Sequence, residues 1–124
     1  MAADGRIALG ARGEDAACAW YRDASYRVLE RNWRCAEGEL DVVACSPDGE
    51  VIVFCEVKTR RSAGFGTPVE AVTAAKQRRV RRLAVRWLAG RGGRERFGRV
   101  RFDVVAVTLG DGGAPVVEVL EDAF

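Results

Sequence analysis

Apolar positions along the chain switch between helical and strand-like spacing, and the switches mark the expected elements. Residues 6–24 carry small and apolar side chains at helical spacing, and residues 26–34 are typical of a strand. The segment 38–58 has two β-branched runs around Ser46-Pro47-Asp48-Gly49, a favourable turn sequence, and predicts a hairpin. The second run, residues 51–57, is apolar on both faces, which is typical of a central strand.

The second half of the chain predicts a long amphipathic helix and two more strands. The Thr67-Pro68 dipeptide resembles an N-cap followed by the first helical residue, so we expect a helix from there to about Ala89. Strands are expected at 100–109 and, at an edge of the sheet, at 116–120. The apolar stripe of the helix consists of Val69, Val72, Val80, Leu83, Trp87 and Leu88, and arginines occupy the opposite arc.

The expected order of elements is therefore α-β-β-β-α-β-β. A helix that returns the chain to the sheet after a central strand implies an α/β fold, with a mixed β-sheet of about five strands flanked by helices. The length of 124 residues suits one domain, 1–124.

The composition restricts the class of protein. Hydrophobic residues make up 48% and charged residues 31%, as in a globular domain. No apolar run approaches the roughly 20 residues of a membrane-spanning helix. The first 15 residues lack the apolar core of a signal peptide. We therefore expect a cytoplasmic protein with no membrane partner.

The chain has no histidine, which excludes a Ser-His or Cys-His nucleophile pair, a histidine metal site and a histidine general base. Its four cysteines form no C-x-x-C pair, so a structural zinc site is not expected. We expect Cys18, Cys35, Cys45 and Cys55 to be reduced and mostly buried.

The small net charge of +2 conceals an uneven distribution. Residues 76–101 contain eleven basic residues and one acid, whereas the rest of the chain is acidic. Arginine enrichment also accompanies GC-rich genomes, but its clustering favours a surface for an anionic partner.

Four charged residues stand at the ends of otherwise apolar strands: Glu39, Asp41, Glu56 and Lys58. Because residues two apart share a face of a strand, Glu39 should point with Asp41, and Glu56 with Lys58. If the faces of the hairpin match, the carboxylates converge, and a divalent cation is the simplest compensation for their charge. Oxygen ligands suit Mg²⁺ or Mn²⁺. Strand-end charges that point into water are the alternative explanation.

The hairpin register decides between these two explanations. Asp41 and Glu56 share a face only if paired residue numbers sum to an odd number, as for Ser46 with Val51. A bulge at Gly49 would turn the two acids to opposite faces.

Two further charged residues fall on faces predicted to be buried. Glu14 lies on the small, apolar face of the first helix, and Lys76 lies between Val69 and Leu83 in the inner stripe of the second. Each alone is explained by a side chain that snorkels or sits at an edge. Together they indicate a shared polar site, so we expect both to be little exposed and on the same side of the sheet as Glu56.

Several sequence blocks resemble a known family. They are G-A-R-G-E-D-A-A, L-E-R-N, G-E-L-D-V-V-A, F-C-E-V-K-T-R, F-G-x-P-V-E-A-V and R-F-D-V-V-A-V, with A-F at the end. In this order they resemble the YraN-like family of uncharacterised bacterial proteins over nearly the whole chain. That family is assigned a restriction-endonuclease-like fold and is likened to archaeal Holliday-junction resolvases.

The resemblance implies an active-site pattern of an acid, a spacer and then D/E-x-K. Here the pattern corresponds to Asp41 and to Glu56-Val57-Lys58, and the helical glutamate of the resolvase-like branch corresponds to Glu14. One departure is that Leu40 replaces the proline that often precedes the first acid.

The implied reaction is metal-dependent hydrolysis of a phosphodiester bond. Asp41, Glu56 and the Val57 carbonyl are expected to ligate Mg²⁺ or Mn²⁺, and Glu14 to hold a metal-bound water or a second ion. Lys58 is expected to orient or deprotonate the attacking water. Lys76 is a further candidate catalytic residue.

Nucleic acid, with DNA favoured, is the expected partner of the basic residues. Arg60, Arg61 and Phe65 lie in a Gly-rich loop that could grip it, or could be an ordinary surface loop. For Asp103 we expect a structural ion pair with an arginine. The other candidate nucleic-acid-binding residues are Gln77, Arg78, Arg81, Arg82 and Arg86.

Three functions remain open at this point. The first is an endonuclease acting on DNA, with branched or flapped DNA favoured because a chain this small has little room for a base-reading module. The second is a nucleic-acid-binding accessory protein with a nuclease-like fold and no turnover. The third is a scaffold whose arginine helix contacts an acidic protein. The sequence leaves the oligomeric state open, a homodimer included.

Overall fold

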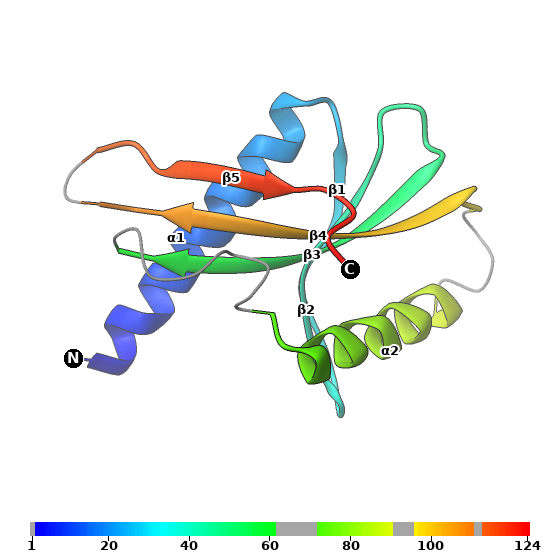
Figure 1. The fold of residues 1–124 in the computed structure, drawn as a ribbon, viewed down its shortest axis with the longest axis horizontal. Coiled ribbons are helices and arrows are strands. Elements are labelled where there is room, and N and C mark those ends of the chain that lie inside the picture. The colour runs from blue at the N-terminus through cyan, green and yellow to red at the C-terminus, as the bar shows by residue number, and fades with distance from the viewer. Residues whose placement is uncertain (1, 62–71, 91–95, 111–112) are drawn as a thin grey trace.

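The computed structural model describes residues 2–61, 72–90, 96–110 and 113–124 (Figure 1). Within them, two helices and five strands follow the predicted α-β-β-β-α-β-β order, so the expected α/β fold is confirmed. The elements are α1 (Ala2–Asp23), β1 (Arg27–Cys35), β2 (Gly38–Cys45), β3 (Val51–Arg60), α2 (Ala74–Gly90), β4 (Arg99–Thr108) and β5 (Val116–Leu120).

The five strands form one mixed sheet in the order β1-β2-β3-β4-β5. All neighbouring strands are antiparallel except β3 and β4, which are parallel because α2 carries the chain back between them. The strand with two apolar faces, β3, is central, and β5 lies at an edge, as predicted.

The turn between β2 and β3 fixes the register that the site requires. The Gly49 N–H donates to the Ser46 carbonyl at 2.9 Å, and Gly49 has φ 79°, which glycine adopts without strain. Val42 then pairs with Cys55, so the paired numbers have the predicted odd sum. A bulge at Gly49 has not shifted the ladder.

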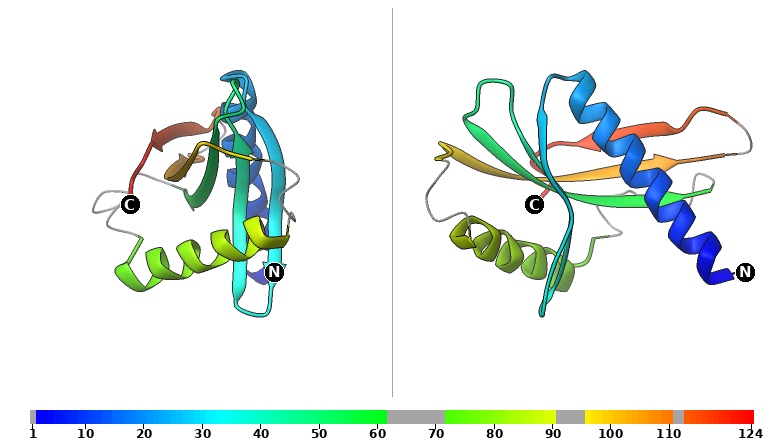
Figure 2. Two further views of the ribbon diagram at one scale, coloured as in Figure 1. Left: turned by 90° about the vertical axis from the view of Figure 1, so that its right-hand side faces the viewer. Right: turned by 180° about the vertical axis from the view of Figure 1, so that it is seen from behind.

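The two helices cover opposite faces of the sheet (Figure 2). On one face α1 packs through Cys18 and Tyr21 against Val53 and Cys55. On the other face α2 packs through Leu83, Ala84 and Trp87 around Phe54 and Phe102. Val80 and Val72, two further members of the predicted stripe, are also buried.

The beginning of α2 differs from the prediction. Val72 and Thr73 are not helical, and the helix begins at Ala74, where the Thr73 hydroxyl accepts the Lys76 backbone N–H at 3.2 Å as an N-cap. The residues expected to start this helix, Thr67-Pro68, lie outside the described residues, as do Phe65 and Val69.

A buried polar network ties β4 to α1. Arg101 donates to both carboxylate oxygens of Asp103 at 2.9 Å, and the Tyr21 hydroxyl donates to the same carboxylate at 2.7 Å. Asp103 is fully buried, so these bonds supply the compensation that its charge requires. The expected structural ion pair of Asp103 is therefore confirmed.

Two findings bear on the expected compartment and on the expected state of the cysteines. No helix among the described residues is long and apolar enough to cross a membrane. The four cysteines form no disulfide, and all except the half-buried Cys35 are buried.

Candidate functional site

The candidate site is built around Glu56, which lies on the central strand β3 and faces α2. Its side chain is only 5% exposed, and its Oε1 atom lies 3.5 Å from Lys58 Nζ and 3.2 Å from Lys76 Nζ. Lys58 comes from the same face of β3, and Lys76 from the first turn of α2. A carboxylate this buried needs such partners, because removing its charge from water is costly.

The position of Lys76 runs against the local preference of the helix. A cation in the first turn faces the positive end of the helix dipole, where acids are favoured, and α2 has no acid there. The Glu56 carboxylate offsets this unfavourable position. Such departures from local preference concentrate at functional sites.

Asp41 joins the site where β2 separates from β3. The paired ladder ends at Val42 and Cys55, and beyond it Asp41 Oδ2 accepts the Val57 backbone N–H at 2.9 Å. The side chain thus replaces the backbone as the partner of β3. This bond holds Asp41 beside Glu56.

The electrostatic environment of Asp41 is unfavourable for its charged form. Burial raises the pKa of Asp41 from its ordinary value of 3.8 to about 7, and the charge of Glu56 adds to the increase. The hydrogen bond from Val57 opposes it, while Glu14 and Glu39 make smaller contributions in the same direction as Glu56. The ionised form of Asp41 is therefore destabilised unless a cation lies beside it.

Glu14 approaches Asp41 from α1, and its side chain is only 15% exposed. Because α1 covers the face of the sheet opposite α2, the expectation that Glu14 and Lys76 lie on one side of the sheet is wrong. Glu14 instead approaches from the other face, at the point where β2 and β3 separate. Gly13 allows the approach, since a Cβ there would overlap the Thr59 hydroxyl of β3.

Sequence reasoning missed Arg31, which belongs to the same region. Its guanidinium lies 3.9 Å from Glu14 and 2.5 Å from Asp15, and it also donates to the Ala11 carbonyl at 3.2 Å. Strand parity would have misplaced it, because its neighbours of the same parity, Leu29 and Trp33, pack under α2 whereas Arg31 reaches α1.

Glu39 does not join the site, contrary to expectation. It is 42% exposed and pairs with Arg34 at 2.9 Å. The strict alternation of β2 breaks at Asp41, because Leu40 packs in the core under α2 whereas Val42 packs in the core under α1. Residues 39 and 41 are therefore not equivalent in orientation.

The site offers a small set of oxygen donors for a metal ion. Among the described residues, no group of three or more cysteine, aspartate or glutamate side chains is arranged to hold a metal. Two carboxylates, Asp41 and Glu56, and the Val57 carbonyl remain. This set fits Mg²⁺, which takes one or two protein carboxylates together with waters and substrate phosphates, and does not fit a structural metal.

The arginines of α2 divide into two groups. Arg78 and Arg82 are exposed and have no partner among the described residues. Arg81 stacks over the Phe102 ring at 4.7 Å, and Arg86 pairs with Glu37.

Of the remaining predicted nucleic-acid contacts, Arg60 and Gln77 have internal roles and Arg61 is exposed. Arg60 Nε donates to Thr108 Oγ1 at 3.3 Å, which leaves its outer nitrogens available. Arg61 directly follows the last residue of β3. The Gln77 amide donates to the Val72 carbonyl at 3.0 Å, which closes the first turn of α2.

Comparison with known proteins places this architecture in a family. The model of the uncharacterised protein family UPF0102 matches residues 13–107, which include Glu14, Asp41, Glu56, Lys58 and Lys76. A UPF0102 protein of Rhodococcus opacus (strain B4) is 51% identical over 95% of this chain and 97% of its own length. UPF0102 proteins of Geobacter sulfurreducens and Streptomyces griseus are 47% and 52% identical, over 94% and 91% of this chain and 88% and 92% of their own lengths.

Proposed function

The chain belongs to the UPF0102 family, and from this premise we propose that it is a metal-dependent endonuclease that hydrolyses phosphodiester bonds of DNA. One observation carries the proposal. The buried Glu56 carboxylate is shared by two lysines and lies beside a second carboxylate, Asp41, whose charged form is disfavoured. A cation and a phosphate would together restore the balance of charge.

In this proposal Asp41, Glu56 and the Val57 carbonyl would hold Mg²⁺ or Mn²⁺. Such an ion would supply a lowered pKa of its coordinated water and would offset the charge that develops on the phosphate. Lys58, whose ammonium is partly exposed, orients or deprotonates the attacking water. Lys76 keeps the Glu56 carboxylate in position.

Glu14 acts from the opposite side of the gap between β2 and β3. Its carboxylate is held near Asp41 by the packing of α1 against β3, and it would accept a hydrogen bond from a water at the site. The Arg31 guanidinium, 3.9 Å from Glu14, limits the repulsion between this carboxylate and Asp41.

The substrate side of the proposal rests on α2. Lys76 begins the helix beside Glu56, and Arg78 and Arg82 continue along its exposed face. Phosphates of a duplex arm bound along this face would lead toward the carboxylates. The small size of the chain favours branched or flapped DNA over a long recognition sequence.

A second candidate is nucleic-acid binding without turnover. It is favoured by the way that Lys58 and Lys76 already neutralise Glu56, with no third carboxylate completing a metal site among the described residues. The same arginines would then bind phosphates while the carboxylates serve only the fold.

A cleavage panel separates the two candidates. Single-stranded, duplex, flap and four-way-junction DNA are incubated with Mg²⁺ or Mn²⁺ and wild-type protein, Asp41→Asn, Lys58→Met or Glu39→Gln. The nuclease proposal expects cleavage by wild type and Glu39→Gln, and none by the other two. Binding of the same DNA without cleavage under any condition would select the second candidate.

A further inference from the structure

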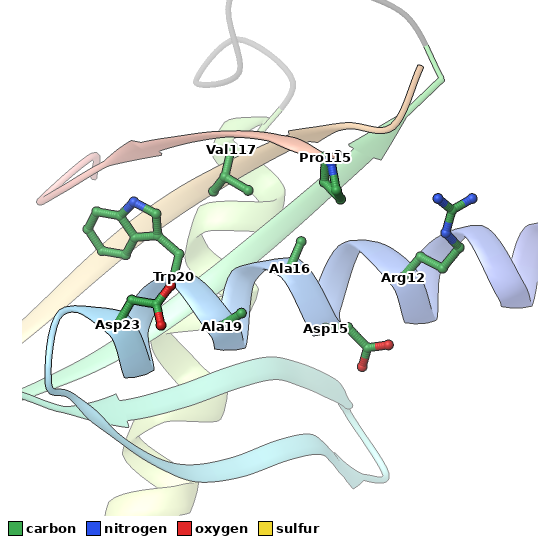
Figure 3. Close-up of a pocket in the computed structure, with 8 residues that line it drawn as sticks. All are labelled: Arg12, Asp15, Ala16, Ala19, Trp20, Asp23, Pro115 and Val117. Carbon is green, nitrogen blue, oxygen red and sulfur yellow. The ribbon is translucent and has the colours of Figure 1, made fainter. Parts of the chain in front are cut away.

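A groove of about 590 Å³ runs between α1 and β5 (Figure 3). Its floor is apolar, formed by Ala16, Ala19 and Trp20 of α1 and by Val117 of β5. Apolar surface of this kind at the edge of a sheet is typical of an interface.

The groove has opposite charges at its two ends. Arg12 lies near one end and Asp23 near the other, and both side chains are exposed (Figure 3). Neither has a partner among the described residues. The third charged residue, Asp15, is already neutralised by Arg31 at 2.5 Å. The two unpaired charges, 11 positions apart in sequence, are separated by about 16 Å along α1.

We propose that a second copy of this chain occupies the groove, with the two α1 helices packed antiparallel about a two-fold axis. The α1 positions that line the groove have the same spacing from either end of the helix. In an antiparallel pair, Arg12 of each copy therefore lies opposite Asp23 of the other. Ala16 lies opposite the other copy's Ala19 at the centre, where small side chains let the helices approach closely. Such a self-complementary patch is what a two-fold dimer requires.

Other arrangements of two copies are less favourable. Parallel α1 helices would place Arg12 against Arg12 and Asp23 against Asp23. Antiparallel pairing of β5 with itself, centred on Glu118, would place two carboxylates directly opposite each other. Of these three arrangements, the antiparallel helix pair alone matches opposite charges at both ends.

The dimer leaves the candidate site accessible. Glu56, Lys58 and Lys76 lie on the face of the sheet covered by α2, whereas the groove lies on the face covered by α1. Glu14, the site residue on α1, does not line the groove. The inference therefore does not rest on the proposed function, and a dimer would present two sites outward.

Sedimentation equilibrium from about 1 to about 300 µM tests the proposal. Wild type should dimerise, and Arg12→Asp or Asp23→Arg should each raise the dissociation constant roughly tenfold, because symmetry removes two ion pairs and introduces repulsion. The double variant Arg12→Asp/Asp23→Arg should restore dimerisation, because exchanging the two charges within each copy restores both opposite-charge pairs across the two-fold axis.

Arg22→Asp is the matched control, since Arg22 is an exposed α1 residue that does not line the groove. It should leave the dissociation constant unchanged, and circular dichroism should show every variant folded. A wild type that stays monomeric over this range, a dimer insensitive to both single variants, or a double variant no better than either single one would each overturn the proposal.

Discussion

Asp41 is the residue whose environment makes the clearest prediction. Asp41→Asn keeps an oxygen that can accept the Val57 N–H but removes the charge. The folded-state pKa of Asp41 is raised to about 7, so the unfolded chain releases this proton first as pH rises. Wild-type stability should therefore fall between about pH 4 and pH 7. In metal-free buffer the variant should be more stable by roughly 1–2 kcal/mol at pH 8 and equal at pH 4, measured by urea unfolding.

Glu39→Gln provides the comparison, because Glu39 is an exposed strand residue close to Asp41 in sequence. Its effect should stay within about 0.5 kcal/mol at both pH values. If Asp41→Asn proves less stable than wild type at pH 8, Asp41 is not the site of accumulated negative charge.

Individual residues of the cluster differed in how far the sequence could predict them. The sequence could predict that Asp41 and Glu56 lie together, because strand parity and a well-defined turn fix which side chains meet. Glu39 was misplaced because parity fails at Asp41, opposite the segment where Asn32 adopts φ 53°. A left-handed asparagine inside a strand has no reliable sequence signal, so the break in alternation could not be foreseen.

At the scale of elements, the seating of α1 against β3 should control the position of Glu14. In Gly13→Ala the new methyl group would overlap the Thr59 hydroxyl and lie 2.8 Å from Thr59 Cβ. Because a β-branched side chain has little freedom to move away, we expect a loss of about 1–3 kcal/mol in the free energy of unfolding. Urea denaturation measures it.

Gly10→Ala is the matched control for this prediction. A Cβ at Gly10 would meet nothing within 4 Å, so alanine should stabilise α1 by about 0.5–1 kcal/mol through helix propensity alone. Thr59→Ala should recover part of the loss in the Gly13→Ala background. Equal effects of the two glycine substitutions would show that α1 does not rest on Thr59.

The helix α2 should divide its arginines between binding and packing. Replacing both Arg78 and Arg82 by glutamine should weaken DNA binding across sequences and reduce its salt slope by about two, since both are exposed and unpaired among the described residues. Arg81→Gln should leave the slope unchanged, because its guanidinium lies over Phe102. Fluorescence anisotropy in a salt series measures both. A reduced salt slope in the single variant Arg81→Gln would contradict this division.

The buried and exposed faces of α2 were predictable from its spacing, but its first residue was not. The chain offers two threonines, Thr67 and Thr73, each able to cap a helix, and the Pro68 that follows the first favoured the wrong one. Side-chain pairing had the same limit: the arginine arc was predicted, but not that Arg81 and Arg86 find partners on other elements. Tertiary contacts, absent from helical periodicity, decide these roles.

At the scale of the whole molecule, the C-terminal segment closes the core beneath α2. The Ala123 N–H donates to the Phe102 carbonyl at 2.7 Å, and the Phe124 ring stacks on the Phe102 ring at 5.3 Å. Arg81 lies over both rings, at 4.7 and 5.7 Å from their centroids. One contact thus joins α2, β4 and the end of the chain, elements that are distant in sequence.

Phe124→Ala should therefore destabilise the protein although Phe124 is only half buried. We expect a loss of about 1–3 kcal/mol in urea unfolding, from the stacked ring pair and the newly exposed surface of Phe102. Val85→Ala, at a valine that is 67% exposed on α2, should change stability by less than about 0.5 kcal/mol. The double variant Phe124→Ala/Arg81→Gln should lose less stability than the sum of the two single losses, by about 0.5–1 kcal/mol. The reason is that both substitutions disrupt the same cation–π contact. Strict additivity would show that Arg81 and Phe124 act independently, and the C-terminal residues would then cover the core without fixing α2.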